Sequence, residues 1–259
     1  MPWERVNIER LQRLFYEGFS VMDIAEPLCF FPADREAEEA RKVMLTRNIE
    51  LAGVLRHGEL IGYVWRDALG EGVCGDCLQE FEPGEVVSDT ASLAGGIEVL
   101  GSHGHCFVEV FGQVSGVIGP NDLEKPQVRI YLFGLITLVE EIFGREIRRL
   151  FPADSWRSAI SPGRLQKAEE LRSERQRRGQ SVDLVDCLQF SDKGQIMARL
   201  DEFREELGMS KRDADRAVKE LEVLRNNLAH SQKIVNEQWR RIPIFSSRID
   251  RILSSLGSA

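Results

Sequence analysis

Short apolar runs and an amphipathic helical pattern alternate twice in the N-terminal half of the chain. In each copy a two-residue turn, Gly58-Glu59 or Gly112-Gln113, separates two apolar runs, as a β-hairpin requires. The first copy predicts an extended piece over residues 21–25, a helix over 34–46 and strands over 51–55 and 60–65. The second copy has the corresponding segments at 85–88, 91–100, 106–111 and 114–118. The common β-α-β-β-α order, at a period of about 60 residues, indicates an internal repeat.

Beyond Pro126 the pattern is helical throughout. Pro126 suits the first turn of a helix that runs to Leu150, and Ser210 suits the cap of a helix that ends near Ser231. The apolar stripe of the first of these helices is expected to include Ile130, Phe133, Leu138, Ile142 and Phe143. Further helices are predicted over residues 164–178, 191–207 and 242–256. Helices with short connections favour an antiparallel bundle.

The predicted fold is therefore of the α+β class, in three parts. Asn7 can cap a short helix within residues 1–17. The two repeats occupy residues 18–125, the first at 18–70 and the second at 80–125. An all-helical part covers residues 126–259.

Charge is distributed unevenly between the two halves. Residues 1–128 contain 10 Lys and Arg against 22 Asp and Glu, whereas residues 129–259 contain 24 against 20. Such asymmetry suggests two domains with different partners. The hydrophobic content of 42% is typical of a globular protein. No apolar run approaches the ~20 residues of a membrane span, and the first residues lack the pattern of a signal peptide. We therefore expect a cytoplasmic protein without a membrane partner.

The five cysteines include one C-x-x-C pair, Cys74 and Cys77. An odd cysteine count without a secretory signal argues against a disulfide framework. A zinc site would need two further ligands, for which His103, His105 and Cys106 are the nearby candidates. Because the second half of the usual spacing is missing, we expect a turn and no metal site here.

The order of elements in the repeats resembles the CBS domain, which occurs in tandem as a Bateman module. The segment Gly116-Val117-Ile118-Gly119-Pro120-Asn121-Asp122-Leu123 is similar to that family's closing strand and helix start. The resemblance implies AMP or ATP as a regulatory ligand, with Asp67, Gly119 and Asp122 as nucleotide-binding residues. In the family a hydroxyl residue commonly stands where this chain has Gly119, and Trp65 stands near that position in the first repeat. Asp67 and Asp122 can equally cap their own helices.

Arg225, Asn226 and His230 lie at the end of the predicted 210–231 helix, whose apolar stripe is Ala214, Ala217, Val218, Leu221, Leu224 and Leu228. At about 100° per residue, Arg225 lies about 40° from the apolar position Leu221, and about 140° from His230. An arginine in an apolar arc must be paired or face a partner surface, since isolated buried charge is costly. The two side chains cannot meet one phosphate on a straight helix. Either the helix end distorts, or the site combines residues of two chains about a symmetry axis; the second option is favoured.

This segment resembles the HEPN family, whose ribonuclease members carry an Arg, a polar residue and a His on a helical bundle that often dimerises. The resemblance implies metal-independent RNA cleavage without a catalytic cofactor. His230 would move a proton near the 2′-hydroxyl, Arg225 would stabilise phosphate charge, and Asn226 would orient the substrate. Glu140 and Glu141 are candidate supporting residues. In the alternative, Arg225 pairs internally with an acid such as Glu222, and His230 is a solvated residue at the helix C-terminus.

The resulting hypothesis is a homodimeric endoribonuclease that is regulated by an adenine nucleotide. The alternatives are a non-catalytic, nucleotide-sensing regulator and a protein that only binds RNA or assembles.

Overall fold

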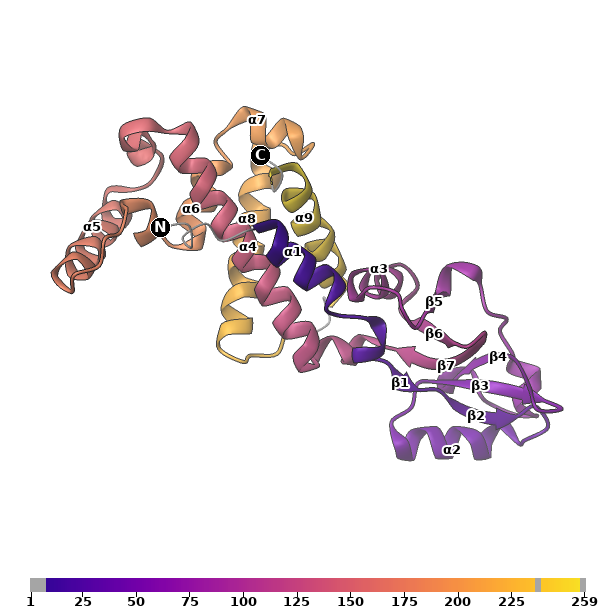
Figure 1. The fold of residues 1–259 in the computed structure, drawn as a ribbon. Helices are drawn as coiled ribbons and strands as arrows, with labels where there is room; N and C mark the ends of the chain where they lie inside the picture. Colours follow the sequence, from indigo (N-terminus) through magenta and orange to yellow (C-terminus); the bar gives the residue numbers. More distant parts are fainter. Residues whose placement is uncertain (1–7, 236–238, 257–259) are drawn as a thin grey trace. The chain divides into compact units, whose positions relative to one another are not determined.

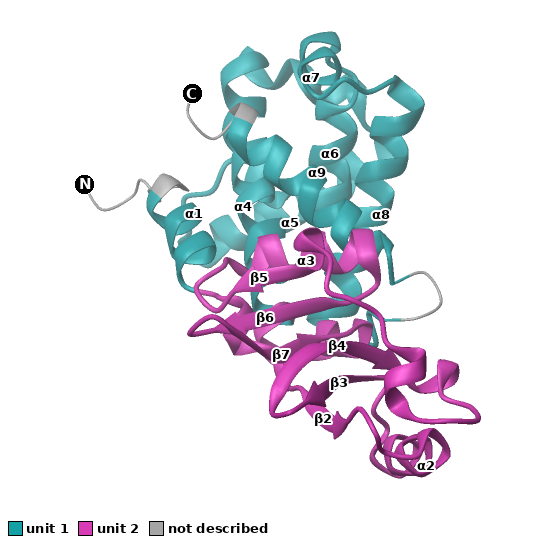
Figure 2. Cartoon of the chain, turned by 90° about the vertical axis from the view of Figure 1, so that its right-hand side faces the viewer, with its two compact units in different colours: residues 1–18, 129–259 teal, residues 19–128 magenta. Residues whose placement is uncertain are grey.

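The structure is a computed structural model that describes residues 8–235 and 239–256, in two compact units (Figures 1 and 2). Unit 2 is Phe19–Val128, and unit 1 joins the segment that ends at Gly18 to the chain from Arg129 onward. The strands of the described residues lie in unit 2, whereas the regular elements described in unit 1 are helices. The fold is thus of the α+β class. None of the helices within the described ranges has the length and apolar character that crossing a membrane requires.

Unit 2 contains the predicted repeat. The first repeat consists of β2 (Cys29–Pro32), α2 (Ala37–Arg47), β3 (Leu51–Arg56) and β4 (Glu59–Trp65). The second consists of β5 (Val86–Ser88), α3 (Leu93–His103), β6 (Cys106–Val110) and β7 (Gln113–Ile118). In both, the first strand runs parallel to the second and the second pairs antiparallel with the third. The hairpin register shifts just after Val54 in one repeat and just after Val108 in the other.

One strand that precedes the first repeat belongs to the sheet of the second. Strand β1 (Glu26–Pro27) precedes the first repeat but pairs antiparallel with β7 of the second, which gives the sheet orders β1-β7-β6-β5 and β2-β3-β4. The predicted extended piece over residues 21–25 is wrong, because Val21–Asp23 forms a short 3₁₀ helix. The Asp23 carboxylate accepts the Ser20 N–H at 2.7 Å, and this bond stabilises the turn. The strand begins only where β7 offers a partner.

Helix α2 lies beside the three-stranded sheet (Figure 1) and shares a hydrophobic core with it. Ala37, Ala40 and Met44 are buried against Ala52, Val54 and Val64 of the strands. Each of these residues recurs at the spacing that its element requires, three to four along the helix and two along β3. Burial of this face supplies the hydrophobic stabilisation of the first repeat.

The helices of unit 1 are α1 (Ile8–Glu17), α4 (Pro126–Leu150), α5 (Pro162–Arg177), α6 (Phe190–Met197), α7 (Asp201–Glu206), α8 (Lys211–Ala229) and α9 (Arg241–Leu256). Helix α1 contacts α9, because the Gln12 amide donates to the Leu253 carbonyl at 3.2 Å. Helices α4 and α6 are joined by an ion pair of 3.1 Å between Lys193 and Glu140. Helices α8 and α9 are joined by one of 2.8 Å between Arg248 and Glu220.

Two expectations for these helices are corrected. The predicted helix over residues 191–207 is divided into α6 and α7 by an extended residue, Leu200, and the Arg204 guanidinium donates to the Ala198 carbonyl at 3.0 Å across the break. Ile130 and Phe133 are 58% and 39% exposed. They lie outside the core because the buried face of α4 is a neighbouring one, which contains Leu132, Leu135, Ile136 and Val139.

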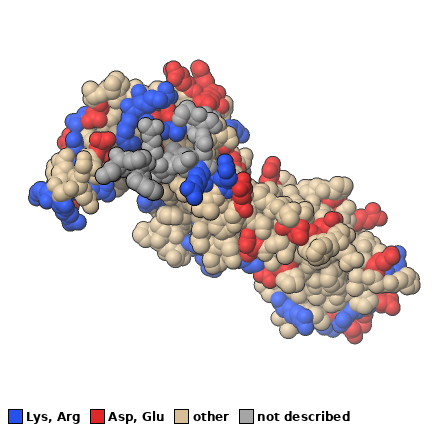
Figure 3. Space-filling model, viewed as in Figure 1, with Lys and Arg blue, Asp and Glu red and all other residues tan. Residues whose placement is uncertain are grey.

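Helix α8 has the predicted polar and apolar faces. Its buried residues are Ala214, Ala217, Val218, Leu221, Leu224 and Leu228. Ser210 caps the helix, because its hydroxyl accepts the Asp213 N–H at 3.2 Å. On the face shown in Figure 3, basic side chains gather over α5, and acidic side chains are spread over unit 2.

Candidate functional site

A cleft of about 360 Å³ in unit 2 is lined by residues of both repeats. Its walls come from β1, the starts of β2 and β3, the loop after α2 and the end of β4 in the first repeat. The second repeat contributes Gly104 and His105, which precede β6, and residues of β7 and the segment after it. The volume lies within the range of small-molecule sites. Two of the three predicted nucleotide-binding residues, Gly119 and Asp122, line this cleft.

Asp122 is held in a fixed position at the edge of the cleft. After β7 the chain turns into a 3₁₀ helix, Pro120–Glu124, and Gly119 is its N-cap residue. Asp122 Oδ2 accepts the Gly119 N–H at 2.7 Å, so the carboxylate caps this turn. A carboxylate oxygen has more than one acceptor position. Capping therefore fixes the side chain without using all of its capacity to accept hydrogen bonds.

Asp67 lies outside the lining of the cleft and is not the counterpart of Asp122. The hairpin registers align the two repeats, because Gly62 pairs with Val54 as Gly116 pairs with Val108. In this alignment Trp65 corresponds to Gly119, and each of the two caps the 3₁₀ turn that follows it. The third residue of each turn is then Ala68 in the first repeat and Asp122 in the second. Asp67 therefore lies one position before the residue that corresponds to Asp122. Its side chain is 80% exposed and pairs with Arg66 at 3.1 Å.

Trp65 lines the cleft at the position equivalent to Gly119. Its ring meets the His105 ring edge-on, with 5.4 Å between the centroids. An indole at the wall of a cleft offers a flat apolar surface on which a nucleobase can stack.

The carboxylates of the cleft are balanced by a lysine. Lys125 Nζ lies 2.9 Å from Asp122 Oδ1, makes an ion pair with Glu26, and donates to the Ile24 carbonyl at 2.6 Å. Partial burial lowers the pKa of Lys125, but the hydrogen bonds to Glu26 and Asp122 outweigh it, so that the pKa is raised overall. Lys125 therefore stays charged and neutralises part of the acidic lining.

The sequence patterns missed three charged residues of the cleft, namely Glu26 on β1 and the pair Arg47 and Glu50. Arg47 and Glu50 both lie beside the end of α2, where Asn48 adopts a left-handed conformation with φ of 54°. Asparagine tolerates this conformation better than most residues. An asparagine directly after a helical pattern is the one local signal that could have marked this loop.

The two histidines considered for the C-x-x-C pair lie with other partners. Cys74 and Cys77 form a short 3₁₀ turn, and the Cys77 thiol contacts the Ala68 carbonyl at 3.3 Å. Burial raises the pKa of the Cys74 thiol, which disfavours the thiolate that metals bind. His103 and His105 instead approach Glu85, at 3.8 and 3.3 Å.

In unit 1, Arg225 and Asn226 line a pocket of about 420 Å³. Arg225 Nη1 donates to Asn226 Oδ1 at 3.4 Å. Glu140, one of the two acids singled out on α4, lines the same pocket together with Arg175 and Glu222. The pocket thus combines two guanidinium groups with three carboxylates, those of Glu140, Asp186 and Glu222. This charge pattern can hold a phosphate only where the cations predominate locally.

His230 is not among the residues that line this pocket. It is the C-cap residue of α8, with φ of −101° and ψ of 14°, and it is exposed. Because α8 stays helical up to Ala229, the two residues remain about 140° apart around its axis. One chain therefore does not assemble these two side chains within the pocket.

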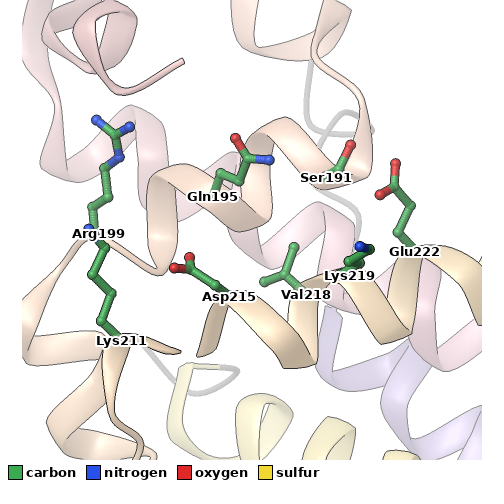
Figure 4. Close-up of a pocket in the computed structure, with 8 residues that line it drawn as sticks. All are labelled: Ser191, Gln195, Arg199, Lys211, Asp215, Val218, Lys219 and Glu222. Carbon is green, nitrogen blue, oxygen red and sulfur yellow. The ribbon is translucent and has the colours of Figure 1, made fainter. Parts of the chain in front are cut away.

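A neighbouring pocket of about 460 Å³ lies between α6 and α8 (Figure 4). Figure 4 shows Arg199 and Lys211 at one end and Ser191 and Glu222 at the other. Glu222 lines both this pocket and the one that contains Arg225. The two pockets therefore adjoin along α8.

No protein-family model and no curated protein matches the chain. Similar solved structures are CBS-domain proteins. CBSX2 of Arabidopsis thaliana in complex with AMP is 17% identical, covers 44% of this chain and 98% of its own, and has a TM-score of 0.38. The CBS domain of a bacterial CNNM/CorC family Mg²⁺ transporter in complex with ATP is 12% identical, with coverages of 47% and 95% and a TM-score of 0.37. A CBS domain-containing protein of unknown function from Bacillus anthracis is 15% identical, with coverages of 42% and 91% and a TM-score of 0.37.

Proposed function

We propose that unit 2 senses an adenine nucleotide, and binds a monophosphate in preference to a triphosphate, in the cleft that contains Trp65 and Asp122. The observation that carries the proposal is the presence of three complementary groups in one cleft: an indole, a fixed carboxylate and the Arg47 guanidinium. Each matches one part of a nucleotide. The indole can stack the base, the carboxylate can accept ribose hydroxyls, and the guanidinium can bind phosphate.

Charge favours the monophosphate. The lining contains Glu26, Glu50 and Asp122 against Arg47, and Lys125 adds one more positive charge beside two of these acids. The balance stays slightly negative. Each further phosphate would bring negative charge into this environment without a matching cation. The choice of adenine rests on the resemblance of the repeats to CBS domains.

Isothermal titration of the purified full chain with AMP, ATP and GMP tests the proposal. AMP is expected to bind most tightly. Asp122→Asn keeps an oxygen that can accept the Gly119 N–H but loses the charge, so the affinity for AMP is expected to fall about tenfold or more. Asp67→Asn is the matched control and should bind AMP like the wild type. Absence of AMP binding, or an equal loss in both variants, would overturn the proposal.

We further propose that unit 1 binds RNA and cleaves it at a site completed by a second chain. The supporting observation is the pocket that Arg225 and Asn226 share with Arg175, next to a pocket lined by Arg199, Lys211 and Lys219. These cations can contact successive phosphates. Arg225 would stabilise charge on the scissile phosphate, Asn226 would orient it, and His230 of the partner subunit would transfer the proton.

Mixing two inactive variants tests the shared site. Arg225→Ala and His230→Ala are each expected to abolish cleavage of a structured RNA in EDTA. When the two variants are mixed and allowed to exchange subunits, one of the two sites in each mixed dimer contains both intact residues. Partial recovery of cleavage is therefore expected for a shared site. Absence of recovery would overturn the shared site. Absence of cleavage by the wild type would leave unit 1 as a non-catalytic RNA-binding or assembly module.

Regulation is the part of the proposal that connects the two activities. Lys125, which pairs with Asp122, directly precedes α4 in the sequence. A nucleotide at Asp122 would compete for this lysine and alter the segment from which α4 starts. RNA cleavage, or RNA binding if the protein does not cleave, is expected to change on addition of AMP in the wild type and to be unresponsive in Asp122→Asn.

A further inference from the structure

Four side chains of the second repeat gather around the segment that leads into β5. Glu82 and Glu85 come from the 3₁₀ turn Pro83–Glu85 and the residue that caps it. His103 ends α3, and His105 directly precedes β6. We infer that Glu82, Glu85, His103 and His105 form a binding site for a divalent metal ion of the zinc class.

Three of the four ligands already lie close together. The ligand atoms of Glu82, Glu85 and His103 are all within 4.8 Å of one another, the one such group of three or more potential ligands found within the described residues, and His105 Nε2 lies 3.3 Å from Glu85 Oε1. Zinc bonds of about 2.0–2.2 Å to nitrogen and oxygen place tetrahedral ligand atoms roughly 3.5 Å apart. Binding of one ion would therefore draw these side chains slightly closer together. Two imidazoles with two carboxylates are a donor set that suits zinc.

His105 is the independent sign that a ligand belongs here. Its side chain is 4% exposed, and its Nε2 lies 3.3 Å from Glu85 Oε1. This distance allows an ion pair when the ring is protonated, but in the neutral ring neither nitrogen meets the geometry of a hydrogen bond to a partner among the described residues. A buried polar nitrogen without a partner is costly. A metal ion at the Glu85 carboxylate would satisfy Nε2.

Hydrogen bonds already orient the Glu85 carboxylate. The Tyr63 hydroxyl donates to Glu85 Oε1 at 3.3 Å, and the Glu82 N–H donates to Oε2 at 3.2 Å. Such outer hydrogen bonds orient a ligating carboxylate.

Aromatic rings enclose one side of the cluster and restrict the access of water. The His105 ring lies 4.9 Å from the Phe107 ring and 5.4 Å from the Tyr63 ring. On the open side, a Cβ atom at Gly84 would lie 3.2 Å from His103 Nε2. The absence of a side chain at residue 84 leaves room for His103 to turn toward Glu82.

His105 connects the cluster to the nucleotide cleft. It lines that cleft together with Arg47 and Glu50 of the first repeat, whereas Glu82, Glu85 and His103 do not. The cluster therefore adjoins the cleft at this one residue.

Zinc titration of the chelator-treated full chain, in competition with a chromophoric chelator, tests the inference. A single Zn²⁺ per chain is expected, with a rise in melting temperature. Glu82→Gln and His103→Ala change exposed side chains and should leave the fold intact. Each should lower zinc affinity by about tenfold or more, the size of loss seen even for groups that only support a ligand. His57→Asn, on the exposed turn between β3 and β4, is the control and should bind zinc like the wild type.

The absorption spectrum of bound Co²⁺ distinguishes a site in this cluster from a site at the cysteine pair. Co²⁺ held by nitrogen and oxygen ligands should show visible d–d absorption without the thiolate charge-transfer band that Cys74 and Cys77 would produce. Cys77→Ser should leave Zn²⁺ affinity unchanged. A thiolate band, loss of zinc binding in Cys77→Ser, unchanged binding in both Glu82→Gln and His103→Ala, or no zinc binding by the wild type would each overturn the inference.

Discussion

Lys125 Nζ lies 2.9 Å from Asp122 Oδ1, so a cation in the segment after β7 neutralises the carboxylate of the proposed nucleotide cleft. The same ammonium pairs with Glu26 of β1. Residues about 100 positions apart in the sequence are thereby joined at the point where β1 meets β7. This one lysine therefore helps to hold β1 beside β7 and also contributes to the charge of the cleft.

Replacement of Lys125 by methionine is expected to lower both the stability of the fold and the affinity for AMP. Two carboxylates would be left without their shared cation, and the side chain is only 26% exposed. The expected loss of unfolding free energy in urea is about 1 kcal/mol, and AMP should bind more weakly because the cleft becomes more acidic. Lys42→Met is the control. Lys42 is 69% exposed and pairs with Glu38 at 3.9 Å, so its replacement should leave both measurements unchanged.

The stability of unit 2 is expected to fall as the pH drops below about 6.5. Burial lowers the pKa of His105 in the folded protein, so the unfolded chain binds a proton at a higher pH than the folded chain does. Stability from this residue is present above the unfolded pKa and is lost as the pH falls toward the folded pKa. The groups that face His105 include Glu85 and His103.

Urea unfolding in the presence of a chelator, at about pH 7.5 and about pH 5.5, measures this effect. His105→Gln should reduce the difference in stability between the two pH values. His57→Asn changes an exposed histidine in a left-handed conformation with φ of 53°, which asparagine tolerates, and should keep the wild-type pH dependence. An equal pH dependence in wild type and His105→Gln would show that His105 does not titrate differently on folding.

Gly194→Ala is expected to destabilise unit 1 by about 1–3 kcal/mol, because it overfills the contact between α6 and α8. A Cβ atom at residue 194 would lie 2.4 Å from Val218 Cγ1. Combination with Val218→Ala should restore part of the loss, which a double-mutant cycle measures by chemical unfolding. Gly163→Ala is the matched control, since nothing lies within 4 Å of a Cβ atom at that position. Strictly additive effects of the two substitutions would contradict the proposed contact.

Several local features could be predicted because they depend on neighbouring residues in the chain. The boundaries of α4, both hairpins and the Ser210 cap follow from proline, turn and capping chemistry. All six residues of the predicted apolar stripe on α8 are buried, because a helical period repeats within a few residues. The same reasoning wrongly predicted that Ile130 and Phe133 are buried, since apolar character alone does not say which side of a helix packs against a neighbour.

The composition of the sites could not be predicted in this way. Asp122 and Trp65 come from different repeats, and Arg47 and Glu50 reach the same cleft from the end of α2. The assignment of Asp67 as the partner of Asp122 rested on counting along the chain, whereas the hairpin register makes Ala68 the equivalent residue. For Arg225, the sequence placed the side chain on α8, but not beside Glu140 and Arg175.

The sequence by itself determined the repeated β-α-β-β order, the helices and the faces of α8, because these arise from contacts and periodicities within about ten residues. Only the tertiary structure decided that β1 crosses to β7, that one cleft collects residues of both repeats, and that His103 and His105 meet Glu85 rather than Cys74 and Cys77. These arrangements depend on which strands pair and which loops they bring together. Residues far apart in the chain meet only once the sheets have formed.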